Sequence, residues 1–368
     1  MTLSPLARRR IENFRKNRRA LWSLRIFSVL FLLSLCAEFI ANDKPILVSY
    51  RGDLYMPVLN TYAETDFGGE FQTEAEYPAP EVQCLIISGG LDLCFDDPEG
   101  VIEDAADGIV EGVAIEQGWI LWPLIPYHFN TINYEVLRAP SAPDESHLLG
   151  TDNQARDVLS RVIYGFRISV LFAITTTLIS AVIGIAAGAV QGYFGGWIDL
   201  FFQRIVEIWQ ATPFLYVIII VSAFFTLGFW PLALLVAIFG WTALVGVVRA
   251  EFLRARNFEY VRAARALGVN DTTIMVRHVL PNAMVATITL LPFLFTSSIA
   301  GLATLDFLGF GLPPSYPSLG EMTLQAKNDL NAWWLGFTAF FTFAIMLSLL
   351  VFIFEGIRDA FDPRKTFA

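Results

Sequence analysis

The chain has 368 residues, of which 55% are hydrophobic and 16% charged, and its mean hydropathy is +0.54. These values exclude an ordinary soluble protein and favour an integral membrane protein. The net charge of −10 is unevenly spread, because residues 42–160 carry 22 acidic and four basic side chains, whereas residues 1–25 carry eight basic and one acidic. The acidity therefore belongs to one extramembrane segment, and no nucleic acid is expected as a partner.

Six apolar runs are long enough to cross the roughly 30 Å hydrocarbon core of a bilayer as helices. They are 21–41, 168–190, 205–229, 231–248, 283–305 and 333–354. The basic residues before the first run place the N-terminus in the cytoplasm, and six crossings return the C-terminus to the same side. We interpret the first run as an uncleaved anchor rather than a signal peptide, because no small-residue cleavage motif follows it.

The predicted fold class is therefore an all-α polytopic membrane protein, with six transmembrane helices and an inserted extracytoplasmic domain of short strands and loops. Its predicted regions are a basic cytoplasmic N-terminus (1–20), a transmembrane helix (21–41), the extracytoplasmic domain (42–160) and a five-helix core (161–368) with a cytoplasmic loop (250–282). Short apolar runs and many Gly, Pro and acidic residues in the external region favour strands and loops over long helices.

Two features of the external region each have two possible interpretations. Cys84 and Cys94 either form a disulfide, as an oxidising compartment favours, or remain two partly buried thiols. The acidic run over 92–107 does not have the spacing of an EF-hand, so a solvated loop is preferred to a Ca²⁺ site. Residues 150–170 predict an amphipathic helix at the outer membrane surface, capped within 151–153, that leads into the second span.

No catalytic chemistry is predicted. The three histidines, at 128, 147 and 278, lack metal-ligand spacing, and none of the four lysines follows a glycine, as a nucleotide-binding Walker A loop requires. The predicted spans carry almost no ionisable groups, which argues against an ion-coupled carrier. No enzyme activity, cofactor or metal is therefore expected, and a transport role needs energy from a partner.

Small residues recur every four positions along the second span, on one helix face. Such a face lets helix backbones approach closely in lipid, and it serves either packing within this chain or contact with a second membrane subunit. The residues of this face are Ser180, Gly184, Gly188 and Gly192.

The polar segment "RAARALGVNDTTIMVRHVLPNA", residues 262–283, separates two apolar runs. It predicts a helix over 251–267, a left-handed turn at Gly268, a second short helix capped by Asn270 or Asp271, and a break at Pro281 before the fifth span. The apolar side chains of Ile274, Met275 and Val279 are costly to expose, so the segment is interpreted as a docking element for another protein.

This segment resembles the EAA loop of bacterial ABC-importer permeases. Ala263, Ala264, Gly268, Leu280 and Pro281 stand in register with that motif. Arg262 replaces the usual Glu and His278 the usual Ile, and both changes are similar to the peptide-importer branch. The stretches "LGTDNQARDVLSRVIYGFRIS" and "LDFLGFGLPPSYPSLGEM" resemble dipeptide and oligopeptide permeases, and the N-terminal stretches "NFRKNRRALWSL" and "AEFIANDKPIL" resemble Yej-type permeases, which are linked to peptide and microcin C uptake.

The resemblance implies a multi-pass permease subunit of a binding-protein-dependent ABC importer for peptides, in the bacterial inner membrane. It implies alternating access driven by cytoplasmic ATP-binding subunits through a coupling helix in the EAA loop. Further implied partners are a second permease subunit, a periplasmic substrate-binding protein, the peptide substrate and membrane lipid. The alternatives are an ABC permease for another solute, such as nickel, and a membrane receptor or anchor that does not transport. The implied coupling residues are Arg262, Ala263, Ala264, Gly268, Asn270, Asp271, Ile274, Met275, His278, Leu280 and Pro281.

Overall fold

The computed structural model describes residues 5–105, 108–110 and 113–361, and the chain folds as two compact units. Unit 1 comprises Met1–Phe31 and Gly165–Ala368, and unit 2 comprises Leu32–Tyr164. The ends of the predicted N-terminal and core regions, and four residues of the predicted external region, lie outside the described residues.

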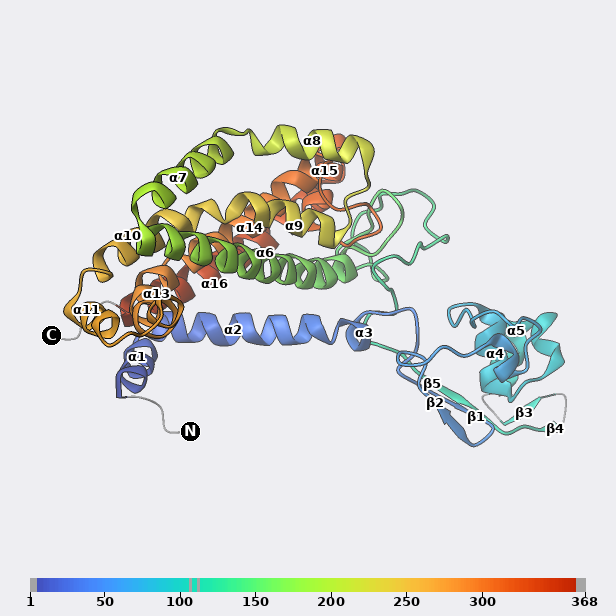
Figure 1. Ribbon diagram of the computed structural model, residues 1–368. Coiled ribbons are helices and arrows are strands. Elements are labelled where there is room, and N and C mark those ends of the chain that lie inside the picture. The colour runs from blue at the N-terminus through green and yellow to red at the C-terminus, as the bar shows by residue number, and fades with distance from the viewer. Residues whose placement is uncertain (1–4, 106–107, 111–112, 362–368) are drawn as a thin grey trace. The chain divides into compact units, whose positions relative to one another are not determined.

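Unit 1 is helical throughout its described part, apart from its connections. Figure 1 shows α11 and α13 at one end of this unit and α8 and α15 at the other. Its helices, with two that continue into unit 2, are α1 (Pro5–Lys16), α2 (Arg18–Leu35), α6 (Val158–Phe194), α7 (Gly196–Ala211), α8 (Phe214–Phe224), α9 (Phe229–Gly240), α10 (Thr242–Ala255), α11 (Glu259–Ala266), α12 (Asp271–Thr273), the π-helical turn η3 (Ile274–Val279), α13 (Leu280–Ile288), α14 (Leu291–Phe307), α15 (Leu319–Asn328) and α16 (Trp333–Phe361).

Two helices, α6 and α16, are each long and apolar enough to cross a membrane, and three bent pairs qualify if each pair is one span. The pairs are α7 with α8, α9 with α10, and Asp271–Ile288 with α14. These five candidates correspond to the second to sixth predicted spans. The first predicted span corresponds to α2 and the short α3, and it is not among the candidates; three arginines lie within the 18 residues of α2.

The predicted third, fourth and fifth spans each consist of two helices joined at a bend. The α7–α8 pair bends by 70° at Thr212–Pro213, since proline lacks an amide donor and disfavours helix in the residue before it. The α9–α10 pair bends by 41°. At this bend the carbonyls of Ala237 and Ile238 accept hydrogen bonds from the side chains of Ser180 and Trp209. The fifth bends by 52° one turn before the proline of α14.

The segment before the second span also differs from its prediction. No separate surface helix forms over 150–170; residues 150–157 are extended or turn, and one 37-residue helix, α6, starts at Val158. Its cap is Asp157, whose Oδ1 accepts a hydrogen bond from the Ser160 amide at 2.7 Å, rather than a residue of 151–153. The reason is that the polar side chains of 150–157 are occupied in a buried network.

That network gathers charged side chains inside unit 2. Asp152 and Arg156 are buried and joined at 2.6 Å (Oδ2 to a guanidinium nitrogen), and the buried Arg161 lies 3.5 Å from the same oxygen. His147, also buried, joins Asp157 through Nδ1 at 2.9 Å and contacts Asn133 through Nε2 at 3.0 Å. Buried charges are tolerated only when paired and hydrogen-bonded, so this stretch fixes the start of α6.

Unit 2 combines short strands and short helices around an aromatic core. A three-stranded antiparallel sheet has the order β2-β1-β5, with Val48 of β1 opposite Tyr55 of β2 and Ile120 of β5. The Phe67 ring packs edge-on against Tyr50 and Tyr77 in the core beside this sheet. Its elements are α3 (Ala37–Ile40), β1 (Leu47–Tyr50), β2 (Asp53–Tyr55), η1 (Glu64–Phe67), α4 (Pro80–Ser88), η2 (Asp92–Phe95), α5 (Pro98–Ala105), β3 (Ile109–Val110), β4 (Val113–Ala114) and β5 (Trp119–Leu121).

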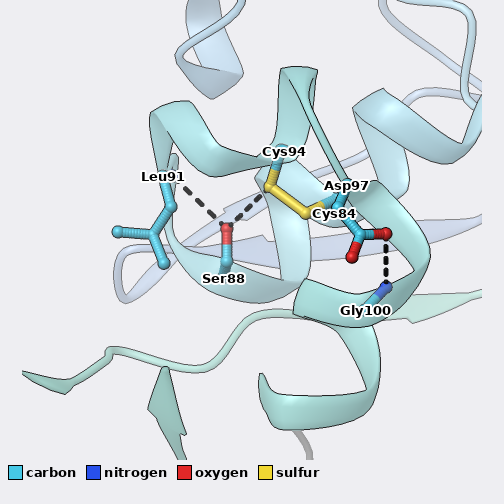
Figure 2. The surroundings of a disulfide bond; sticks show 6 residues. All are labelled: Cys84, Ser88, Leu91, Cys94, Asp97 and Gly100. Atoms are coloured by element: carbon cyan, nitrogen blue, oxygen red, sulfur yellow. Dashed lines mark hydrogen bonds between the residues drawn. A yellow bond between two sulfur atoms is a disulfide. The ribbon is translucent and has the colours of Figure 1, made fainter. Parts of the chain in front are cut away.

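A disulfide joins the helical part of unit 2. Cys84 of α4 bonds to Cys94 of η2, with a Cα–Cα distance of 5.5 Å, as Figure 2 shows. The Ser88 hydroxyl accepts a hydrogen bond from the Leu91 amide at 3.3 Å, and Asp97 accepts one from Gly100 in α5. The acidic side chain at 97 thus stabilises the first turn of a helix.

Candidate functional site

The loop between α10 and α14 forms the candidate site, and its central turn agrees with the sequence. Gly268 has φ of +79°, the left-handed conformation expected after α11. Asn270 is the cap of the next helix, because its side-chain oxygen accepts a hydrogen bond from the Thr273 amide at 2.8 Å. These two residues make the loop a tight helix–turn–helix.

Two details of the loop's predicted path are wrong. The predicted helix over 251–267 is interrupted between Ala255 and Glu259, where Phe258 is extended and precedes α11. Pro281 does not interrupt the helix, because it lies in the first turn of α13, directly after the π-helical η3. The Leu280 amide bonds to the Met275 carbonyl, five residues back, so the wider turn carries the helix up to a proline that has no amide to donate.

The base of the loop is buried in unit 1. Ile274 and Val279 are fully buried in one cluster with Val248, Phe252 and Val261, and Met275 packs against that cluster. The sequence had suggested that a partner protein covers these side chains, but none is needed, because one turn of the short helix faces α10 and α11 and its apolar stripe is covered within the chain.

Other apolar residues form the exposed tip. Leu267 is 83% exposed and Val276 59% exposed, on either side of the Gly268 turn. Exposed large apolar side chains beside a tight turn are typical of a contact surface. Sequence spacing did not single them out, because Leu267 belongs to the end of one helix and Val276 to the outer face of the next.

A polar clamp holds the turn to the end of α6. The Tyr193 hydroxyl donates a hydrogen bond to the Asp271 carboxylate at 2.5 Å, and Arg265 Nε lies 3.7 Å from the same oxygen. The Arg265 guanidinium also lies over the Tyr193 ring, 5.0 Å from its centroid. Hydrogen bonding to Tyr193 raises the pKa of Arg265. Three helices, α6, α11 and α12, thus share one contact.

A second ionic contact joins α10 to α7. Arg249 Nε and a terminal nitrogen donate to the two carboxylate oxygens of Asp199 at 2.5 and 2.7 Å. Such bidentate pairs are geometrically specific and stronger than single contacts. The sequence signal for this pair was one charge near the inner end of each helix, which alone did not indicate pairing across 50 residues. On the surface of α7, Arg204 also pairs with Glu207, at 2.5 Å.

The small-residue face of α6 packs within the chain. A Cβ added at Gly184 would lie 2.5 Å from the Trp241 carbonyl, and one at Gly192 would lie 2.5 Å from the Arg249 carbonyl; Gly188 is similarly close to Val245. Ser180 donates a hydrogen bond to Ala237 at 3.1 Å. Of the two alternatives, packing within the chain explains this face, and α6 lies directly against α9 and α10.

The eleven coupling residues predicted from the resemblance differ in accessibility. Ile274 is buried, and Ala264, Met275, His278 and Leu280 are partly exposed. The others are exposed: Arg262, Ala263, Gly268, Asn270, Asp271 and Pro281. Exposed Arg265 and Arg277 add to Arg262, so the outer face of the loop is basic.

The third stretch used for the resemblance is a loop closed by one carboxylate. Asp306, at the end of α14, accepts hydrogen bonds from the Leu312 amide at 2.7 Å and from the Ser318 hydroxyl at 2.5 Å. Gly311 and Gly320 lie so close to Asp306 that any side chain there would collide with it. Asp306 is buried, so it acts as the structural centre of residues 306–320.

The helical unit with candidate spans and the internally braced polar loop fit a membrane transport component. The chain belongs to the family described as binding-protein-dependent transport system inner membrane component, whose sequence profile matches residues 180–367. It is therefore a permease subunit of an ABC importer of the inner membrane, a family of transport components rather than catalytic subunits.

Named relatives extend the similarity over the whole chain. The peptidoglycan transport system permease protein YejE of Agrobacterium fabrum is 51% identical over 99% of this chain and 94% of its own length. The inner membrane ABC transporter permease protein YejE of Escherichia coli is 50% identical over 99% and 98%. The glutathione transport system permease protein GsiD of Pectobacterium atrosepticum is 34% identical over 66% and 80%. The match to the YejE proteins includes unit 2, which lies outside the family profile.

Proposed function

We propose that this permease subunit carries peptides inward, and that a partner ATPase drives it by gripping loop 250–282. The peptide substrate is supported by the names of the similar permeases, which act on peptidoglycan, glutathione and, in further relatives, dipeptides and oligopeptides. Microcin C-like peptides belong to the same proposed class, as the Yej-type resemblance implies.

The observation that carries the coupling role is the contrast between the base and the tip of the loop. The base is buried against α6, α10 and α13, whereas Leu267 and Val276 protrude. Because packed cores transmit displacement rather than absorb it, a pull on the tip moves these helices together. Alternation between inward-facing and outward-facing states needs such a lever.

The charge of the tip defines the partner's surface. Arg262, Arg265 and Arg277 are exposed and basic, so the docking cleft of the ATPase is expected to be acidic at its rim and apolar where it receives Leu267 and Val276. Complementary charge of this kind selects the partner and its orientation more than it adds affinity.

The proposed topology has six crossings, with both termini in the cytoplasm and unit 2 outside. The basic residues of α1 and α2 support a cytoplasmic N-terminus. A disulfide in unit 2 suits an oxidising compartment. A second permease subunit and lipid complete the membrane part, and a periplasmic binding protein delivers the substrate.

The turn at Gly268 provides the test of this coupling. Gly268→Val should abolish co-purification of the ATPase, because a β-branched residue strongly disfavours positive φ and the turn must rearrange. No atom lies within 4 Å of an added Cβ at Gly268, so the effect comes from backbone conformation and not from collision. Transport by reconstituted complexes should fall in parallel.

Gly246→Val is the matched control. Gly246 lies within α10, with no positive φ and equally open space around an added Cβ, so ATPase binding should persist. Retention of the ATPase by the Gly268 variant at the level of the control would remove the coupling role of this turn.

A further inference from the structure

Unit 2 contains a groove of about 1050 Å³ whose lining comes entirely from residues 43–135. Proline and aromatic side chains form much of its wall, including Trp122, Tyr127 and Tyr134. Tyr134 is largely exposed, so a large aromatic face is held at the surface without a hydrophobic partner over most of its area. Neither the coupling loop nor the helix packing of unit 1 explains this groove.

The carboxylates of the groove outnumber its cations. Asp43, Glu74, Glu76 and Glu135 line it, against the single Lys44. Lys44 is already joined to Glu74 by an ion pair, and Asp43 accepts a hydrogen bond from Thr131 at 2.6 Å. Two carboxylates remain for a ligand, because neither Glu76 nor Glu135 forms an ion pair among the described residues, and both are exposed.

A buried hydroxyl provides the independent sign of a ligand. Tyr77 lines the groove and is only 1% exposed, and its hydroxyl has no hydrogen-bond partner in the described part of the chain. Burial and the neighbouring Glu74 raise the pKa of Tyr77, and a tyrosine hydroxyl is a hydrogen-bond donor at neutral pH. A buried unpaired hydroxyl is costly, and an external acceptor would remove that cost.

The other residues that line the groove indicate which class of ligand it binds. Proline-rich and aromatic walls accommodate an extended peptide backbone, and the faces of Trp and Tyr attract cations. The side-chain amides of Gln83 and Asn130 offer hydrogen bonds to peptide groups, whereas that of Asn133 is engaged by His147 and by the Glu135 amide. The combined excess of negative charge favours a ligand that carries positive charge over an anionic or neutral one.

We propose that the groove of unit 2 binds a short extended peptide with positive charge, through Glu76 and Glu135 at its rim and the Tyr77 side chain in its lining. The peptide class rests on the proposed function, of which this site is a first binding step on the permease itself. The peptide backbone lies along the aromatic and proline wall, and an ammonium or guanidinium group meets the carboxylates.

Binding is tested with the intact permease complex in lipid nanodiscs, without nucleotide or binding protein. The probes are fluorescent tetrapeptides of matched length, Lys-Lys-Lys-Gly and Glu-Glu-Glu-Gly, and a neutral amino-sugar disaccharide. The lysine peptide should bind with an affinity that weakens as salt is raised, because the contacts are exposed charges. The acidic peptide and the disaccharide should not bind measurably over the same concentrations.

The variants separate charge at the groove from charge elsewhere in unit 2. Glu76→Gln with Glu135→Gln should weaken lysine-peptide binding about fivefold to tenfold. Glu103→Gln with Asp104→Asn, which removes two exposed carboxylates of α5 outside the groove, should leave affinity within about twofold.

Tyr77→Phe supplies a readout that a purely structural role would not give. It should weaken binding while leaving the unfolding temperature unchanged or raised, because an unpaired buried hydroxyl is removed. Equal binding of all three probes, preference for the disaccharide, or equal weakening by both double variants would overturn the proposal. If the Glu76 and Glu135 double variant no longer bound peptide but still transported it with ATP, the groove would not be a binding step, and the proposed function would stand. The Gly268 experiment, in contrast, tests only the proposed function.

Discussion

Replacement of Asp152 by alanine should lower the free energy of unfolding of unit 2 by about 3–5 kcal/mol. Asp152 is fully buried, pairs with Arg156 at 2.6 Å and lies 3.5 Å from the buried Arg161. Its other oxygen accepts the Arg156 amide at 3.0 Å. The variant removes negative charge from between two buried guanidinium groups, and each of those groups is expensive to keep away from water.

The purified full chain is unfolded by heat and by denaturant. Unfolding of unit 2 is monitored by the reactivity of its cysteine thiols after reduction. Asp152→Asn, which keeps the shape and an acceptor oxygen, should lose less than Asp152→Ala. Asp104→Ala is the matched control, because it removes an exposed carboxylate of the same unit and should change stability by less than about 0.5 kcal/mol. A similar small change for Asp152→Ala would contradict the buried network.

The second large effect is expected at Gly192. A Cβ there would lie 2.5 Å from both the Arg249 carbonyl and the Phe252 Cβ, closer than real contacts allow. Gly192→Val should therefore force α6 away from α10, with a loss of about 3 kcal/mol or more, at the upper end of overpacking effects. Phe252 belongs to the cluster under the coupling loop, so transport should be lost as well.

Gly301→Val is the control for that variant, because no atom lies within 4 Å of an added Cβ at Gly301. Stability is measured by the temperature at which the detergent-solubilised chain leaves its monodisperse peak, and transport by peptide uptake into vesicles. If Gly192→Val lowered stability and transport no more than Gly301→Val does, close approach of α6 and α10 would not be required.

The sequence predicted the parts of the coupling loop that depend on local rules. A glycine with positive φ and an asparagine cap are determined by neighbours within a few residues, so Gly268 and Asn270 were recognisable. The contacts that brace the loop were not, because Tyr193 and Asp271 are 78 residues apart and Arg249 and Asp199 are 50 apart. Such pairs become visible only when the helices are placed side by side.

The hydropathy pattern predicted apolar runs that correspond to the five candidate spans, but not the shape of those spans. The apolar runs around Pro213 and Trp241 read as continuous, since hydropathy averages over a window and ignores single backbone hydrogen bonds. The sequence also could not predict what buries Ile274 and Val279. An apolar stripe on a short helix predicts that the stripe is covered, but not which residues cover it. In unit 2 the composition predicted short strands, and the Cys84–Cys94 disulfide was one of two alternatives left open by the sequence, whereas the groove is assembled from segments spread over 43–135.

The central claim is that the exposed tip of the loop is gripped by a separate ATPase. The most direct measurement places a single cysteine at Val276 in a chain whose free Cys36 is replaced by serine, and applies a short thiol cross-linker to the assembled complex. Ile11→Cys on α1, an exposed apolar position in the predicted cytoplasmic N-terminus, is the control. We predict a cross-link from position 276 to the ATPase, with a yield that is retained through the nucleotide cycle, and none from position 11. A position 276 that reacts freely with a water-soluble maleimide in the complex, and never cross-links to the ATPase, would contradict the account.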